Sequence, residues 1–332
     1  MIKQRIEYLD SVKAFDIVLM MLGHCYWKES VPYMNAAIYS FHMPLFFIIS
    51  GFFIKPLRAG EAIHKYFFAY IKPYILTSVF ILAMIAVIDF FSDSKVDYFK
   101  DWLLRVSFAS GSDKGKELFA SLPIIGALWF LPALFCGNLI FSILLRRHDG
   151  IELFSIICIL FVVSYCSVRI IRLPFSIQAG MSATLFLWIG NKIRQFSVVD
   201  TVSKSYIIIG CMFIVWFACI LKGGVSISHC VYSLGLISVL GAISASLLIF
   251  CAFKEYPALS CLGGGGKMGQ HTLLILCIHE VCLYYQLVYG NPFVLLPYNH
   301  VVNLLIEFMT YIFVAFAGTF VINEMNLKLW KK

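Results

Sequence analysis

The stretch NAAIYSFHMPLFFIISGFFI, residues 35–54, decides the class of fold. It contains no lysine, arginine, aspartate or glutamate. An α-helix needs about 20 mostly apolar residues to cross the hydrocarbon core of a bilayer, and this stretch has that length. Pro44 interrupts the helical hydrogen-bond ladder, and Ser50-Gly51 allows another helix to approach closely. The stretch therefore predicts a transmembrane helix that carries a proline and packs tightly against a neighbour.

The composition of the whole chain extends this interpretation. Of the 332 residues, 61% are apolar and 13% are charged, and the mean hydropathy is +0.88. Soluble proteins have about 25% charged residues, so this chain cannot cover a water-facing surface. The 16% of aromatic residues excludes a disordered chain. We expect an all-α, polytopic transmembrane bundle.

Apolar runs of spanning length recur along the chain, and we expect about ten of them to cross the membrane. They lie near residues 11–28, 35–54, 71–91, 126–145, 151–168, 174–194, 204–222, 229–252, 270–289 and 300–322. The longest extramembrane segment is 92–125. We therefore expect one integral membrane domain over residues 1–332, without a separate soluble domain.

Lysine and arginine set the orientation, because they are enriched in cytoplasmic loops. With the N-terminus inside, 17 of the 26 lysines and arginines lie on the cytoplasmic side, and both termini are cytoplasmic. The net charge of +8 is spread between the apolar runs, so we expect no nucleic-acid partner. The 11 cysteines have no zinc-finger spacing, and we expect no metal.

Ionisable residues at membrane depth are costly and are therefore functional candidates. The first helix carries Asp10, Lys13, Asp16 and His24. At 100° per residue, His24 lies about 20° around the helix from Lys13, about 40° from Asp10 and about 80° from Asp16. His24 is also about 16 Å along the axis from Lys13. This stripe suits either a long charged molecule that enters from the cytoplasm or pairing with other helices. His42 is a second imidazole that could face the first helix.

Several strings of residues occur in an order that resembles the acyltransferase 3 family, which are integral membrane O-acyltransferases that modify sugars, mostly in bacteria. They are Tyr8-Leu9-Asp10-Ser11-Val12-Lys13 running on to Gly23-His24, Phe41-His42-Met43-Pro44-Leu45-Phe46-Phe47 with Ser50-Gly51-Phe52, Leu128-Trp129-Phe130-Leu131-Pro132, Leu173-Pro174-Phe175 with Leu187-Trp188-Ile189-Gly190, and Gly266-Lys267 leading to Ile278-His279. The resemblance covers essentially the whole chain. Its fucose 4-O-acetylase-like branch looks nearest, through the Phe-His-Met-Pro-Leu-Phe-Phe run.

The resemblance implies a set of site residues. A basic residue followed, after ten others, by an active-site histidine corresponds here to Lys13 and His24, with lysine where arginine is usual. The family's Arg-x-x-Arg pair before the third helix is absent, and Lys65 and Lys72 stand in that region. We therefore expect these three lysines to contact the phosphates of acetyl-CoA or of another acyl-CoA, such as succinyl-CoA. The missing pair leaves a divergent donor open.

Other candidates have substrate or structural roles. Trp129 and His279 lie in the matching strings, and Glu280 points about 100° away from His279, so we expect it to pair with another helix. The run 263–267 is glycine-rich, and we interpret it as a flexible connection rather than a phosphate site. Arg169 and Arg172 contact either an acidic glycan or lipid headgroups. His64, His148, His229 and His300 are expected to face water or headgroups.

The sequence thus predicts a membrane-bound enzyme that transfers an acetyl or other short acyl group from acyl-CoA to a sugar hydroxyl of a cell-surface or exported glycan. His24 would act as general base, tuned by Asp10 or Asp16, or would carry the acyl group itself. No cofactor is expected to be permanently bound. The expected partners are the acyl-CoA, a glycan or lipid-linked sugar and the bilayer, in the bacterial cytoplasmic (inner) membrane. The sequence predicts no oligomeric state.

Two other classes of function stay open. A transporter or flippase would also be polytopic, but such proteins often show inverted repeats, and none is visible here. A non-enzymatic accessory subunit of a polysaccharide export system would explain the missing arginine pair.

Overall fold

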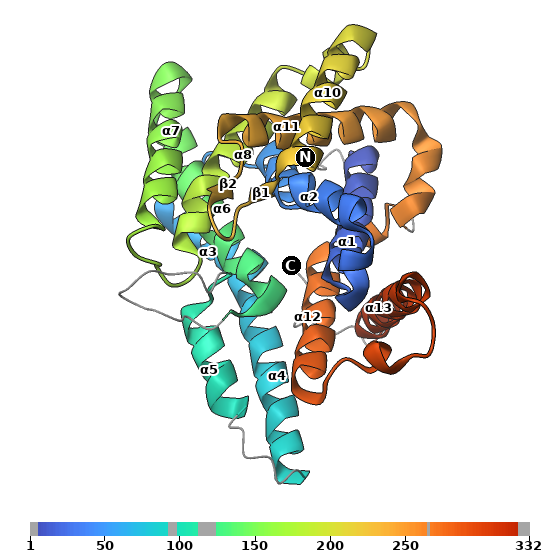
Figure 1. The fold of residues 1–332 in the computed structure, drawn as a ribbon. Helices are drawn as coiled ribbons and strands as arrows, with labels where there is room; N and C mark the ends of the chain where they lie inside the picture. Colours follow the sequence, from blue (N-terminus) through green and yellow to red (C-terminus); the bar gives the residue numbers. More distant parts are fainter. Residues whose placement is uncertain (1–5, 92–97, 112–123, 264–265, 325–332) are drawn as a thin grey trace.

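The computed structural model describes residues 6–91, 98–111, 124–263 and 266–324. In these parts the chain is almost entirely helical (Figure 1). The helices are α1 Glu7–His24, α2 Pro32–Phe52, α3 Ala59–Tyr66, α4 Lys72–Phe91, α5 Tyr98–Phe108, α6 Phe130–Arg147, α7 Gly150–Ser167, α8 Ile177–Gln195, α9 Val198–Val202, α10 Tyr206–Lys222, α11 Leu236–Glu255, α12 Thr272–Tyr289 and α13 His300–Glu324. A small antiparallel hairpin, β1 Val225–Ser226 and β2 Val231–Tyr232, joins α10 to α11.

Each predicted apolar run contains a helix, and seven helices of the described residues are long and apolar enough to span a membrane. They are α2, the continuous helix Ala59–Val87, Gly126–Arg147, α7, α11, α12 and α13. The helices α1, α8 and α10 are not among them. In α1 the charged residues Glu7, Asp10, Lys13 and Asp16 lower the hydropathy, and α10 has 17 residues. The all-α transmembrane class is confirmed, whereas the number of spans and the side of the termini stay predictions.

Two details correct the predicted boundaries. The eighth run, predicted over 229–252, begins as a helix only at Leu236, because the chain before it forms the hairpin. Left-handed backbone at Cys230 (φ 49°) and Gly235 (φ 58°) is incompatible with a continuing α-helix there. The segment 92–125 contains the helix α5, and residues 92–97 and 112–123 lie outside the described residues.

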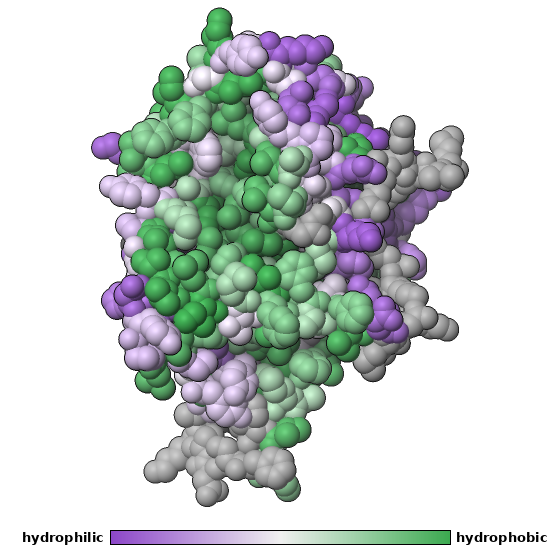
Figure 2. All heavy atoms as spheres, turned by 90° about the vertical axis from the view of Figure 1, so that its right-hand side faces the viewer, coloured by the Kyte–Doolittle hydropathy of each residue, from purple (hydrophilic) through white to green (hydrophobic). Residues whose placement is uncertain are grey.

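The bundle has a buried centre and an apolar periphery. The spanning windows of α2 and α11 are 67% and 61% buried, whereas those of α7 and α13 are 17% and 22% buried. Figure 1 shows α7 and α13 at the edges of the molecule, and Figure 2 shows a face dominated by hydrophobic side chains. Large apolar side chains stay exposed on the outer helices, such as Ile159 on α7 and Phe313 on α13. This distribution is the one that a lipid-facing protein requires.

The helices α2 and α8 cross at backbone contact. A Cβ atom added at Gly51 would overlap the carbonyl group of Leu187, and one added at Gly190 would overlap that of Ile48. Beside the crossing, the hydroxyl of Ser50 donates to Asn138 Oδ1 of α6 at 2.9 Å. Small residues at helix contacts are the usual means of tight packing in bilayers. The close approach expected from Ser50-Gly51 is therefore made to α8.

Replacement of Gly190 by alanine should destabilise the protein by about 1–3 kcal/mol, because the new methyl group overlaps the backbone of α2. The measurement is the thermal unfolding midpoint of the detergent-solubilised protein. The control is Gly210→Ala on α10, where the added methyl group meets no atom within 4 Å. This control should leave the midpoint unchanged or raise it, because alanine has the higher helix propensity. Equal midpoints for the two variants would contradict the proposed packing.

Candidate functional site

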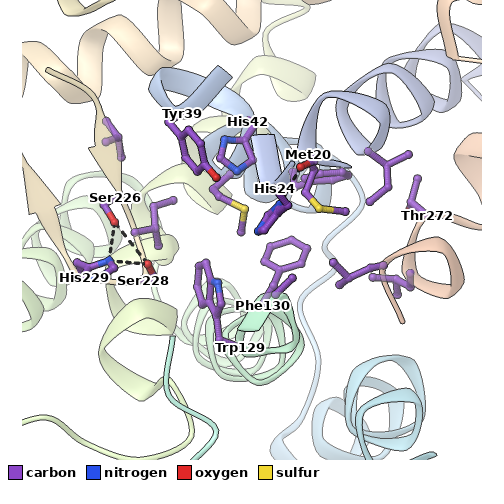
Figure 3. A pocket seen from close by; sticks show the side chains of 18 residues that line it. Met20, His24, Tyr39, His42, Trp129, Phe130, Ser226, Ser228, His229 and Thr272 are labelled. Atoms are coloured by element: carbon purple, nitrogen blue, oxygen red, sulfur yellow. Dashed lines mark hydrogen bonds between the residues drawn. The ribbon is translucent and has the colours of Figure 1, made fainter. Parts of the chain in front are cut away.

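A cavity opens among the ends of several elements (Figure 3). Its volume is about 160 Å³, and it opens to the outside. Its walls are formed by α1, α2, the turn Gly126–Trp129 with the start of α6, the β1–β2 hairpin and the first turn of α12. The lining residues are Ile17, Met20, His24, Tyr39, His42, Met43, Phe46, Ala127, Trp129, Phe130, Val225, Ser226, Ile227, Ser228, His229, Thr272, Leu273 and Leu276. A concave, mostly apolar lining with a few polar groups is the usual form of a small-molecule site.

His24 is the last residue of α1 and forms part of the cavity wall. Its Nδ1 atom lies 2.7 Å from the carbonyl oxygen of Met20, one helical turn earlier. Because a carbonyl oxygen can only accept, Nδ1 is the donor in this contact. In the neutral imidazole the lone pair then belongs to Nε2. The helix end thereby fixes both the tautomer and the direction of the ring.

His42 is held in the same manner on α2. Its Nδ1 atom donates to the carbonyl oxygen of Ile38 at 2.9 Å, and its ring meets that of Tyr39 edge-on, with centroids 4.9 Å apart. The hydroxyl of Tyr39 donates to the carbonyl oxygen of Gly23 at 2.7 Å, next to His24. The cavity thus brings His42 and His24 together, and Tyr39 fastens α2 to the end of α1.

His279 lies behind His24 and is buried. Its ring centroid is 5.5 Å from that of His24 and 4.8 Å from that of Tyr311, both in edge-to-face contact. Among the described residues, neither of its nitrogens has a hydrogen-bond partner. Tyr311 in turn donates to the buried carboxylate of Glu307, which also accepts the backbone N–H of Tyr26 at 2.8 Å. His279 therefore supports the ring of His24 from outside the cavity.

Glu280 holds the turn that carries Trp129. Its carboxylate accepts the backbone N–H of Ala127 at 2.6 Å, and a Cβ atom at Gly126 (φ 74°) would overlap it. Glu280 was expected to pair with another helix, and its carboxylate contacts the turn before α6 and not His279. The side chain of Trp129 projects into the cavity from the turn that Glu280 fixes (Figure 3).

The other charged residues predicted on α1 do not reach the cavity. Lys13 Nζ pairs with Asp10 Oδ1 at 2.8 Å, and the ammonium group also lies over the ring of Phe53. Asp16 is fully buried, and neither carboxylate oxygen has a hydrogen-bond partner among the described residues. Neither the aspartates nor Lys13 line the cavity. The structure therefore does not join this stripe and His24 into one site.

Lys65 and Lys72 also stand apart from the cavity. Lys65 is exposed near the end of α3, with its ammonium group 4.8 Å from the centre of the Tyr66 ring, and Lys72 begins α4. Neither residue lines the cavity. Gly266 of the glycine-rich run packs against the first turn of α1. Arg169 lies over the ring of Tyr165, 4.1 Å from its centre.

Sequence reasoning missed the hairpin. His229 was expected to face water or headgroups, but it lines the cavity with Ser226 and Ser228. Cys230 beside it points into the protein, where burial raises the pKa of its thiol to about 12. A signal was present in Gly223-Gly224, because glycines end a helix and polar residues then follow at alternate positions.

No group of three or more histidine, cysteine, aspartate or glutamate side chains that could hold a metal ion occurs in the described part of the chain.

These features define a helical membrane protein with a cavity that is lined by imidazoles from α1, α2 and the β1–β2 hairpin. The family model for the acyltransferase 3 family, described as an acyltransferase domain, matches residues 6–324, and the chain belongs to this family. The match spans nearly the whole chain, as the resemblance of the strings implied. No curated protein and no solved structure shows a significant match to the chain.

Replacing Glu280 by alanine should destabilise the protein by about 1–3 kcal/mol, because it leaves the buried N–H of Ala127 without an acceptor. The control is Glu152→Ala, which removes only a surface contact with His148. Surface ion pairs contribute about 0–1 kcal/mol, so its effect on the unfolding midpoint should be small. If the unfolding midpoint of Glu280→Ala equals that of Glu152→Ala, the carboxylate of Glu280 does not hold the turn.

Proposed function

We propose that this membrane acyltransferase transfers an acetyl or other short acyl group from acyl-CoA to a hydroxyl group of a sugar, with His24 as the general base. The observation that carries the proposal is the contact from His24 Nδ1 to the carbonyl of Met20 in the cavity wall. This contact leaves the basic lone pair on Nε2, where a proton can be accepted. The family supports the acyl-transfer chemistry.

In the proposed reaction, the hydroxyl oxygen of the sugar forms a bond to the thioester carbonyl carbon while Nε2 of His24 accepts the hydroxyl proton. The carbon–sulfur bond then breaks, and the proton passes to the departing sulfur, so that an ester and free coenzyme A thiol leave. An imidazole suits both steps because its ordinary pKa is near working pH. Apolar walls such as Met20, Phe46 and Phe130 limit water, which would otherwise hydrolyse the thioester.

The side chains that line the cavity suggest that the sugar and the thioester bind inside it, whereas the phosphates of the donor bind outside it. Aromatic side chains and hydroxyl groups line the cavity, whereas lysine and arginine are absent from its described lining residues. The phosphates of the donor would therefore stay outside, and only its thioester end would reach His24. Lys13, Lys65 and Lys72 are the candidates for phosphate contacts, although Lys13 is already paired with Asp10. We place the enzyme in the bacterial cytoplasmic membrane, with a cell-surface or exported glycan as acceptor.

His24→Ala should reduce acyl transfer by about 10²–10⁴-fold, the range for loss of a general base. The assay follows release of free thiol from acetyl-CoA by purified protein, together with the acyl content of glycans from cells that carry each variant. The control is His148→Ala, a histidine on the surface that pairs with Glu152. It should retain full turnover and full glycan modification.

Glycan modification by His24→Ala at the wild-type level would reject His24 as the base and would favour the accessory-subunit interpretation. Intact mass measurement during turnover distinguishes direct transfer from an acyl-histidine. Only the second route gives an acyl increment on wild-type protein that is absent from His24→Ala.

The double variant Lys65→Ala with Lys72→Ala should raise the KM for acetyl-CoA several-fold with little change in kcat, because the lysines would attract phosphate without touching the reacting atoms. The effect should shrink at high salt, which screens exposed charges. Lys65→Arg with Lys72→Arg retains the charge and should keep the wild-type KM. Lys222→Ala, at the end of α10, is the matched control. A wild-type KM in the alanine double variant would remove these lysines from the donor site.

A further inference from the structure

The connection between α10 and α11 forms one wall of the cavity. The consecutive residues Val225, Ser226, Ile227, Ser228 and His229 all line it. Of these residues only His229 lay in a predicted run, 229–252, and residues 225–228 were expected in the connection before it. The hairpin instead presents a continuous stretch of chain to the cavity.

The hairpin is held firmly in this position. Its strands pair Val225 with Tyr232 and Ser226 with Val231. Behind them, the hydroxyl of Tyr232 forms a hydrogen bond with the hydroxyl of Ser182 on α8, and its ring packs against that of Phe161 on α7, with centroids 4.8 Å apart. Ile227 is buried at 1% exposure. The hairpin is therefore built into the bundle and is not a loose surface loop.

The turn of the hairpin carries a cluster of two hydroxyl groups and one imidazole. Nδ1 of His229 lies 2.9 Å from the hydroxyl oxygens of both Ser226 and Ser228, and these two oxygens are 3.4 Å apart. The two serines thus fix the imidazole through Nδ1 and place three polar side chains on the same wall. Hydroxyl and imidazole groups both donate and accept hydrogen bonds, as the hydroxyls of a sugar do.

The cluster and His24 lie at different parts of the same cavity, and Trp129 rises between them (Figure 3). A sugar ring has hydroxyl edges that need hydrogen-bond partners and an apolar face that an indole can cover. The described lining contains no aspartate, glutamate, lysine or arginine, so it offers no permanently charged side chain to an acidic or amino sugar. An uncharged sugar is the ligand that matches these walls.

We infer that the β1–β2 hairpin is the acceptor-recognition element, in which His229, Ser226 and Ser228 bind hydroxyl groups of an uncharged sugar whose reacting hydroxyl faces His24. This inference rests on the proposed function and adds to it the class of acceptor and the residues that select it. His229 binds and orients the acceptor, whereas His24 takes the proton.

The test separates acceptor binding from the chemical step. Purified protein in detergent receives acetyl-CoA, and free thiol is followed with and without the methyl glycosides of fucose, rhamnose, glucose and galactose. Thiol release without glycoside measures transfer to water, and the increase with glycoside measures transfer to sugar. In His229→Ala and in Ser226→Ala with Ser228→Ala, the KM for the active glycoside should rise about tenfold, the size of a lost hydrogen bond. The basal thiol release is recorded for each variant, because it separates a loss of acceptor binding from a loss of the chemical step.

Two further variants serve as controls for the role of the His229 side chain. His229→Gln keeps an amide N–H at similar reach and should recover part of the affinity, whereas His148→Ala should match wild type. Size-exclusion profiles and unfolding midpoints identify any variant that fails to fold. The hairpin variants that do fold then show whether the hairpin binds the acceptor.

The outcomes are distinguishable. A wild-type KM in the folded hairpin variants overturns the inference and leaves the proposed function intact. A parallel loss of basal thiol release also overturns it, because the hairpin would then support the chemistry and not the acceptor. If wild-type protein shows no glycoside-dependent release, the proposed function fails, and the inference fails with it.

Discussion

The structure depends on one constraint: a backbone group in hydrocarbon must find its hydrogen-bond partner within its own helix. Chemistry that needs irregular backbone is therefore confined to places where helices begin or end. The cavity lies at such places, with His24 at the end of α1, Trp129 in the turn before α6, and the hairpin between α10 and α11. The bundle supplies a rigid frame, with His42 from the middle of α2, and the other functional groups come from helix ends and connections.

The same constraint explains how the imidazoles are oriented. His24 and His42 each donate Nδ1–H to the carbonyl oxygen four residues earlier in the same helix. This arrangement needs no second charged residue, which would be costly to bury. It also differs from a carboxylate-assisted histidine, because Asp10 and Asp16 stay outside the cavity. The buried rings of His279 and Tyr311 then support His24 from behind through edge-to-face contacts.

The sequence predicted the helical elements well because their signal is local. The runs that became α2, α7 and α13 are long and apolar, and no tertiary contact is needed to recognise them. His24, His42 and Trp129 were predicted as site residues through their places in the matching strings, and all three line the cavity. The spacing of Lys13 and His24 did not show that the cavity includes His24 and excludes Lys13, because angular position on a helix does not reveal where a cavity ends.

Gly223-Gly224 signals the end of a helix, but the position of the hairpin in the bundle could not be predicted, because it depends on contacts far away in sequence. The tyrosine Tyr232 is fixed by Ser182 and Phe161, and no periodicity within residues 223–235 reveals these partners. Glu280 illustrates the same limit: its rotation away from His279 was calculable, but its partner Ala127 was not. The pattern of apolar residues in a sequence does not identify the distant residue with which a single polar group forms a hydrogen bond.

The hairpin connects α10 to α11, and its backbone takes no part in the helical hydrogen bonds of either helix. Substitutions in its turn can therefore accumulate without altering a membrane-embedded hydrogen bond, whereas substitutions at Gly51 or Gly190 would disturb the bundle itself. Evolution can thus diversify one wall of the cavity while conserving the other. A scaffold divided in this way is suited to producing many enzymes that share a single chemistry and differ in what they modify.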